Sequence, residues 1–327
     1  MKINSNKLKS LILLSLVGSA STNEEKPTNQ SELTLNSLPE IGTNLTKQGD
    51  DSDPTFVFGG YPVLMMDDLN RENIKNCTIS FFTLYRNSSD CDYGDSFPIG
   101  IITSSLCSPV AGGEDNIVRV WTRDKSLHLG DVIYMTFGEY NEITNFDYAL
   151  TSIFNIFTDR NEFLSYTAGL TNNDKTVSEL YPVIGTSLPQ LGIICAYGSG
   201  SGYRCGSQVG SDLEITIPSP WKSGSTITFK GLNKVDMGKN GFESEEDRGG
   251  PVYSVGSSVD KKTVINALGH ITWLNNTDPN HKLVYYTPTD KVLSAILENN
   301  KCSYSLLTYN ETNNKEFQAQ VEAPPKK

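Results

Sequence analysis

The sequence predicts an all-β protein with one helix near its C-terminal end. Only 20% of its 327 residues are charged and 27 are glycine, a composition typical of turn-rich β proteins. Between about residues 55 and 290, short apolar or alternating runs are separated by turn residues, and these runs are rich in β-branched and aromatic side chains. No internal repeat is visible, so a repeat architecture is not expected.

The expected strands follow one another along the chain, each bounded by Gly, Asn, Asp or Pro. In order they include Thr78–Leu84, Ile117–Trp121, Asp131–Met135, Glu214–Ile217, Thr226–Phe229 and Val264–Leu268. The one convincing helix covers Asp290–Leu297, where the apolar residues recur at helical spacing. These patterns suit a barrel or a sandwich and do not choose between them.

The two ends of the chain are predicted to lie outside the fold. Residues 1–20 read as a secretory signal peptide, because lysines precede a short apolar stretch and a small-residue cleavage site. That stretch is too short to span a bilayer, and no later run is apolar enough for a membrane span. Residues 21–53 are polar and are interpreted as a disordered lead or pro-segment. Residues 303–327 are interpreted as a disordered tail, which leaves 54–302 as the folded part.

Charge and cysteine content restrict the class of partner. The chain has 27 Lys and Arg against 38 Asp and Glu, a formal net charge of −11. Nucleic acids and anionic membranes need a basic footprint, so we expect neither as a partner.

Six cysteines in an exported chain suggest three disulfides, whose pairing the count leaves open. With three histidines and no Cys-x-x-Cys spacing, we expect no metal site and no cofactor.

Glycosylation sequons also fit a passage through the secretory route, although each is short enough to arise by chance. The candidate acceptors are Asn29, Asn44, Asn76, Asn87, Asn275 and Asn310.

Four short motifs together resemble chymotrypsin-like serine proteases. Gly100–Cys107 is similar to the segment around the catalytic histidine, and Phe146–Leu150 is similar to the catalytic aspartate motif. Cys195–Gly206 is similar to a disulfide hairpin of the bacterial branch, related to α-lytic protease and the streptogrisins. Glu246–Val252 lines up with the serine motif, Gly-Asp-Ser-Gly-Gly-Pro-Val. The motifs follow the order of the family along the chain.

The resemblance implies two six-stranded antiparallel β-barrels with a C-terminal helix and a cleft between the barrels. The first barrel would cover about residues 56–175 and the second about residues 176–298. Gly269–Trp273 resembles the strand that lines the primary specificity pocket, so His270, Thr272 and Trp273 are expected there. The family pattern also implies the disulfides Cys91–Cys107 and Cys195–Cys205, which leaves Cys77–Cys302 as the third.

The residues at the catalytic positions of this motif set cannot perform the reaction of the family. Leu106 stands at the histidine position and Arg248 at the serine position, and neither is a general base or an acyl-transfer nucleophile. Glu246, at the first glycine of the oxyanion turn, would repel a developing oxyanion. Asp147 alone remains of the three catalytic residues. Asp247 also survives, and in the family it pairs with a cation.

No competing triad is predicted. The three histidines are interpreted as surface or satisfied strand residues, and the candidate serines lie in Gly/Ser turns without a nucleophile-elbow pattern. These residues are His128, His270, His281, Ser199, Ser201 and Ser257.

A buried Asp147 without its histidine would need another partner. One hypothesis is that Arg248 pairs with Asp147 across the vacated cleft, with the Thr272 hydroxyl as a second donor. The alternative is that Arg248 points outward and pairs locally with an acidic residue of its own segment, Glu243, Glu245 or Glu246.

Three functions fit the sequence. The favoured one is a secreted pseudoprotease that binds an extracellular protein or peptide, because Leu106, Glu246 and Arg248 replace the working groups. The second is an active serine endopeptidase with a site elsewhere. The third is an adhesion or glycan-binding module, for which the 15 tyrosines would suit but no basic patch for acidic glycans is present.

Overall fold

The computed structural model describes residues 57–86, 91, 98–111, 117–136, 144–153, 164–170, 177, 179–187, 192–257 and 263–312. All of them belong to one compact unit, Ile41–Lys327. The signal-peptide and lead predictions, with Asn29, Asn44 and Asn87, lie outside the described residues. None of the helices in the described ranges is long and apolar enough to cross a membrane.

The first sheet closes into a six-stranded antiparallel ring, in which β2 and β3 are the two halves of one bent strand. β2 pairs with β1, β3 pairs with β4, and the ring continues through β8, β6 and β5 back to β1. The strands are β1 (Pro62–Asp67), β2 (Ile74–Thr78), β3 (Phe82–Tyr85), β4 (Ile99–Thr103), β5 (Val118–Thr122), β6 (His128–Met135) and β8 (Ala149–Ile153). Alternate side chains point inward and form an apolar core that includes Met65, Ile79 and Ile101.

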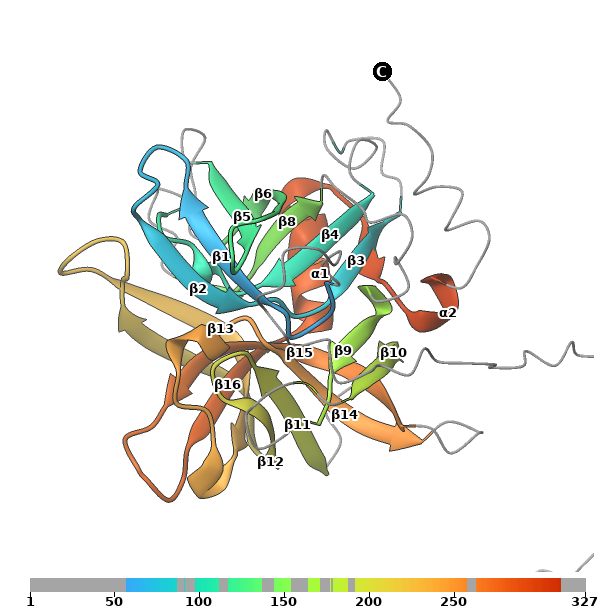
Figure 1. The fold of residues 1–327 in the computed structure, drawn as a ribbon. Coiled ribbons are helices and arrows are strands. Elements are labelled where there is room, and N and C mark those ends of the chain that lie inside the picture. The colour runs from blue at the N-terminus through green and yellow to red at the C-terminus, as the bar shows by residue number, and fades with distance from the viewer. Residues whose placement is uncertain are drawn as a thin grey trace, which may run out of the picture. The chain divides into compact units, whose positions relative to one another are not determined.

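The second sheet closes in the same way. β11 pairs with β12, and antiparallel pairing continues through β13, β16, β15 and β14 back to β11. The strands are β11 (Ile193–Gly198), β12 (Gly202–Pro218), β13 (Thr226–Asp236), β14 (Pro251–Ser257), β15 (Thr263–Asn275) and β16 (Leu283–Pro288). Figure 1 shows the blue and green strands of the first ring beside the yellow and orange strands of the second. The predicted pair of six-stranded antiparallel barrels is thus confirmed.

Three short strands extend the second sheet. β7 (Thr144–Asn145) pairs parallel with β13, and β10 (Leu180–Thr186) pairs parallel with β15 and antiparallel with β9 (Tyr166–Ala168). The predicted terminal helix is confirmed as α1 (Thr289–Asn300), which is longer at both ends than expected. Its buried face, with Val292 and Ile296, packs on Ile102 and Leu150 of the first barrel.

The predicted tail begins too early. Tyr304–Leu306 forms β17, which pairs antiparallel with β3, and a short helix α2 (Tyr309–Thr312) follows. Tyr304 and Leu306 are buried while Ser305 between them is half-buried. A strand of three residues is too short to give a recognisable sequence pattern, and the free edge of β3 supplies its partner.

The structure corrects two of the three predicted disulfides. Cys77 pairs with Cys107 and Cys91 pairs with Cys302, whereas Cys91–Cys107 and Cys77–Cys302 were expected. Cys77 lies near the end of β2, and Cys107 lies in the turn formed by Ser105–Cys107, with the two Cα atoms 5.8 Å apart. The predicted Cys195–Cys205 pair is confirmed and links directly opposed residues of β11 and β12.

Candidate functional site

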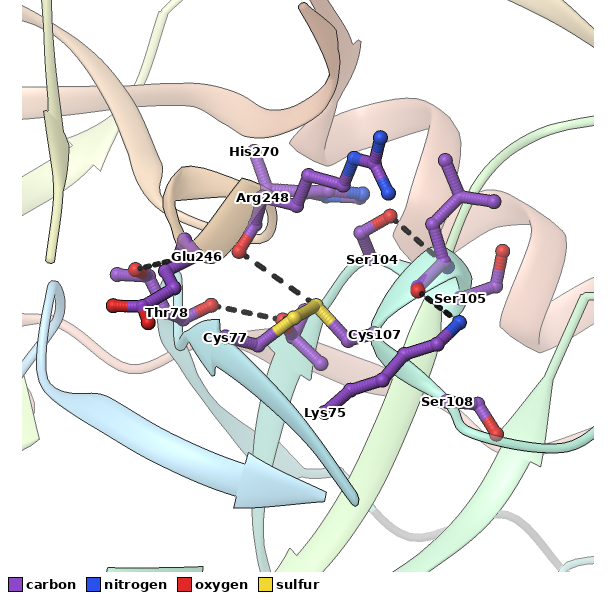
Figure 2. Close-up of a disulfide and its surroundings, with 12 residues drawn as sticks. Lys75, Cys77, Thr78, Ser104, Ser105, Cys107, Ser108, Glu246, Arg248 and His270 are labelled. Carbon is purple, nitrogen blue, oxygen red and sulfur yellow. Dashed lines mark hydrogen bonds between the residues drawn. A yellow bond between two sulfur atoms is a disulfide. The ribbon is translucent and has the colours of Figure 1, made fainter. Parts of the chain in front are cut away.

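The residues that the sequence motifs assign to the three catalytic positions come together where the barrels meet. Leu106 lies in a 3₁₀ turn, η1 (Ser105–Cys107), Asp147 precedes β8, and Arg248 follows a second 3₁₀ turn, η4 (Glu245–Asp247). The Arg248 carbonyl accepts the Thr78 amide of β2 at 3.0 Å. Gly249 next to it has φ 80°, and a Cβ there would overlap Thr103, so this turn needs glycine. Figure 2 shows these segments around the Cys77–Cys107 disulfide.

Asp147 is completely buried and is held by four donors. Its Oδ1 accepts the Ser105 amide at 2.8 Å and the Ser105 hydroxyl at 2.5 Å. Its Oδ2 accepts the Ser104 hydroxyl at 2.6 Å and Nε2 of His270 at 3.1 Å. Burial alone would raise the pKa of Asp147, but the hydrogen bond and charge of His270 and the two serine hydroxyls lower it below the usual value.

His270 is therefore a satisfied strand histidine, as the sequence predicted. It comes from β15 and its side chain is 1% exposed. The sequence did not identify its partner. The expected contact between Thr272 and Asp147 is wrong, because the Thr272 hydroxyl bonds the Thr287 hydroxyl at 2.8 Å. His270 lies two residues before Thr272 on the same strand, so the expected position was placed two residues too far along β15.

Leu106 has become a core residue. It is 2% exposed and packs against the β12–β13 hairpin, in an apolar cluster that includes Ile217, Ile227 and Phe229. Leu106, which the sequence motifs assign to the histidine position, is thus part of a hydrophobic contact between the two barrels. The Leu106 carbonyl accepts Nζ of Lys75 at 3.2 Å.

Arg248 pairs with its own segment and not with Asp147. Its Nη2 donates to Oε1 of Glu245 at 2.9 Å, and its Cζ lies 4.8 Å from the centre of the Trp273 ring. The predicted Arg248–Asp147 pair is wrong, because the Asp147 carboxylate already has four donors. The alternative, a local ion pair, is confirmed, although the Arg248 side chain is 12% exposed and so does not point into solvent.

The amides that would hold an oxyanion are engaged inside the chain. In the family these are the backbone N–H groups of the first glycine and of the serine. Here the Glu246 amide donates to Oγ of Ser244 at 3.2 Å, and the Arg248 amide donates to the Glu245 carbonyl at 3.2 Å. The 3₁₀ turn η4 thus turns both donors away from the junction.

The Glu246 side chain ties this turn to the first barrel. One carboxylate oxygen accepts Nδ2 of Asn76 at 3.1 Å, and the other pairs with Nη2 of Arg123 at 3.3 Å. The Glu246 carbonyl accepts the Thr78 hydroxyl at 2.7 Å. Glu246 therefore stabilises the conformation of η4 in which the Glu246 and Arg248 amides donate within the chain, and it also adds negative charge.

Asp247 is anchored by neutral donors. It accepts the Gly200 amide at 2.9 Å, the Ser201 amide at 2.8 Å, the Ser201 hydroxyl at 2.5 Å and the Ser244 amide at 3.1 Å. No cation pairs with it among the described residues, in contrast to the expectation from the family. Burial raises the pKa of Asp247, and the hydrogen bonds offset part of that shift.

The remaining candidate residues lie away from the junction or at its edge. His128 pairs with Asp131 and His281 with Asp236, both near the surface. Asn76 and Asn310 are exposed and Asn275 is half-buried, and glycosylation of any of them stays a prediction. Within the described ranges, no three His, Cys, Asp or Glu side chains are placed to hold a metal ion.

Sequence reasoning missed Lys75 and Trp221 at this site. Lys75 Nζ lies 5.9 Å from the centre of the Trp221 ring, and Nε1 of Trp221 donates to the Ser108 carbonyl at 3.0 Å. Neither residue belongs to a recognisable motif. They come together through the packing of the β12–β13 hairpin on the first barrel, which sequence spacing does not encode.

Two closed six-stranded antiparallel rings with a terminal helix define this chain as having the chymotrypsin-like fold. No protein-family model matches the chain, and no curated protein matches it.

Several solved bacterial proteases are similar to it. Protease A of Thermobifida fusca is 17% identical, with a TM-score of 0.48, over 77% of this chain and 98% of that chain. A Nocardiopsis protease is 16% identical, with a TM-score of 0.49, over 77% and 99%. A chymotrypsin of Cellulomonas bogoriensis is 16% identical, with a TM-score of 0.46, over 77% and 98%.

Proposed function

We propose that this chain is a secreted pseudoprotease that acts by binding a protein or peptide partner. The observation that carries the proposal is the combined state of the junction. Leu106 is buried in an apolar core, Arg248 stacks on Trp273 at the serine position, and the amides of the oxyanion turn donate to Ser244 and Glu245. Acyl transfer needs a base, a nucleophile and free oxyanion donors together, and Leu106, Arg248 and the engaged amides supply none of them.

The Asp147–His270 pair does not make a substitute triad. In such a triad the serine donates to the histidine, and the histidine donates to the aspartate. Here Ser104 and Ser105 donate directly to Asp147, so the serines bypass His270. The His270 side chain is 1% exposed, which keeps substrate and water from the imidazole. The pair therefore supports a structural role for these groups.

Export is supported by two independent features. Residues 1–20 have the pattern of a signal peptide. Three disulfides and no free cysteine in the described part of the chain suit an oxidising, extracellular compartment. Detection of the processed chain in the culture medium of expressing cells tests this part, and retention inside the cells would contradict it.

The direct test of catalytic inactivity is labelling with a fluorophosphonate probe, which reacts with activated serines. We expect no labelling of the purified full chain under conditions in which a reference chymotrypsin is fully labelled. A heat-denatured sample of each protein controls for non-specific reaction. A probe adduct mapped to any serine of the native chain by mass spectrometry would refute the proposal.

A gain-of-function series tests the assignment of the positions. The double variant Leu106→His, Arg248→Ser should stay unlabelled. Glu246 still fixes the turn through Asn76 and Arg123, so its amides remain unavailable to an oxyanion. Adding Glu246→Gly should allow labelling at the new serine, since it frees the turn and removes the negative charge. Urea unfolding of both variants establishes that they fold. A folded triple variant that remains unlabelled, or a double variant that labels equally well, contradicts the role given to Glu246.

A further inference from the structure

Two cations with aromatic neighbours lie on either side of the Leu106 segment. Lys75 reaches it from β2, with Nζ 3.2 Å from the Leu106 carbonyl and 5.9 Å from the centre of the Trp221 ring. Arg248 reaches it from the end of η4, with its guanidinium 4.8 Å from the centre of the Trp273 ring. Figure 2 shows Arg248 and Lys75 on opposite sides of the segment that carries Ser104, Ser105 and Cys107. We call Lys75, Arg248, Trp221 and Trp273 the cationic site.

The acidic residues near this site are held by other groups or exposed to solvent, and Asp147, with four donors of its own, acts on Arg248 through its charge and not through a hydrogen bond. Glu246 is already engaged by Asn76 and Arg123. Glu245 makes one ion pair with Arg248, and its side chain is 83% exposed. The pKa of Lys75 is lowered to about 8, first by burial and then by the charge of Arg248, with Glu245 opposing. The charge of Arg248 thus disfavours the charged Lys75 amine, while Glu245 and Asp147 favour the charged guanidinium.

Hydrogen-bond donors are also in excess. Nε of Arg248 is buried and has no hydrogen-bond partner among the described residues. A guanidinium has five N–H donors and an ammonium has three, and both prefer to donate to carboxylate or phosphate oxygens. One donor of Arg248 meets Glu245 and one of Lys75 meets the Leu106 carbonyl. Within the part of the chain that the structure describes, the site thus has more hydrogen-bond donors than acceptors.

From these observations we infer that the cationic site binds a carboxylate of an acidic peptide segment in the partner, which displaces Glu245 from Arg248. This inference rests on the proposed function and names the chemistry of the bound segment. In the free protein the Glu245 carboxylate occupies the place proposed for the peptide carboxylate. Its Oε1 lies 2.9 Å from Nη2 of Arg248, and the Glu245 side chain is 83% exposed. The two tryptophan rings flank the cations and offer apolar surface to the rest of the peptide.

A peptide carboxylate is favoured over a sulfated glycan by the charge of the whole chain. The net charge of −11 repels a densely charged polyanion, while one or two acidic residues of a peptide experience mainly the local field of Lys75 and Arg248. A glycan would also need an extended row of cations, whereas Lys75 and Arg248 lie close together at one junction.

The binding test uses fluorescein-labelled hexaglutamate, with hexaglutamine as the neutral control, measured by fluorescence polarisation on the full chain. We expect hexaglutamate to bind and hexaglutamine not to bind, with affinity falling as salt is raised. Arg248→Gln and Lys75→Gln should each weaken binding about tenfold or more. Glu245→Gln should tighten it, because the internal competitor is removed. Lys239→Gln removes the same charge at an exposed remote site and should change nothing. Equal loss in the Lys239 variant, or none at Arg248 and Lys75, overturns the inference.

A second readout follows the Lys75 ammonium by NMR of ¹³C-labelled lysine. A bound carboxylate favours the charged amine, so hexaglutamate should raise the pKa of Lys75 from about 8 toward 10.5. An unchanged Lys75 pKa at saturating peptide places the carboxylate elsewhere and refutes this site. Tighter binding of a heparin oligosaccharide than of hexaglutamate refutes the peptide class. Either result can occur without any fluorophosphonate labelling, so failure here is distinct from failure of the proposed function.

Discussion

Replacing Leu106 by alanine tests whether the histidine position has become part of the core. The Leu106 side chain is 2% exposed and packs on Ile217, Ile227 and Phe229. The substitution removes three carbons, and at about 0.8 kcal/mol for each buried carbon the lost transfer free energy is about 2.4 kcal/mol. The hairpin is fixed by strand pairing and cannot close the cavity fully, which adds further cost. We therefore expect the free energy of unfolding to fall by about 3–4 kcal/mol.

The assay is urea unfolding of the oxidised protein, followed by tryptophan fluorescence and by circular dichroism. Leu297→Ala is the matched control, because it removes the same atoms from an α1 side chain that is 47% exposed. We expect the control to change the free energy of unfolding by about 0.5 kcal/mol or less. A loss of under about 1 kcal/mol at Leu106, or equal losses at both positions, would show that Leu106 faces an open cleft and would refute the reasoning.

Two further predictions concern the disulfides and the buried aspartate. Replacing both cysteines of the Cys91–Cys302 pair by serine should lower the free energy of unfolding by about 5 kcal/mol, against about 3 kcal/mol for Cys195–Cys205, because the sequence separations are 211 and 10. Equal losses in urea titrations would contradict this loop-entropy argument. The pKa of Asp147 is lowered on folding, so its ionised form stabilises the chain above the unfolded value of 3.8, and that stability is lost as the pH falls through the folded pKa. In urea titrations at several pH values, Asp147→Asn should reduce the fall in the free energy of unfolding that occurs at acidic pH. An unchanged pH dependence would count against the buried carboxylate as its cause.

The fold could be predicted from the sequence because the motifs are local and their order is informative. Gly100–Cys107 and Glu246–Val252 lie next to each other in the structure as the resemblance implied. The terminal helix was also predictable, since its apolar spacing has the helical period. Each of these patterns lies within a short run of consecutive residues, so it can be recognised in a single sequence without an alignment.

The contacts within the site could not be predicted, because they depend on register and on packing between distant segments. His270 and not Thr272 reaches Asp147, although both residues belong to the same strand, β15. Cys107 bonds Cys77 of β2, whereas the resemblance to the family implied Cys91. The placement of Lys75 beside Arg248 had no sequence signal at all.

The attachment of β17 and Cys302 to the first barrel has a consequence for the order of folding. β17 completes the edge of β3, and Cys302 bonds Cys91. These elements leave the ribosome after every strand of the second barrel, so the first barrel lacks β17 and its Cys91–Cys302 disulfide until residues 302–306 have been synthesised. Nascent chains halted before residue 302 should therefore depend on chaperones and be easily cut by proteases, however well the early strands pair.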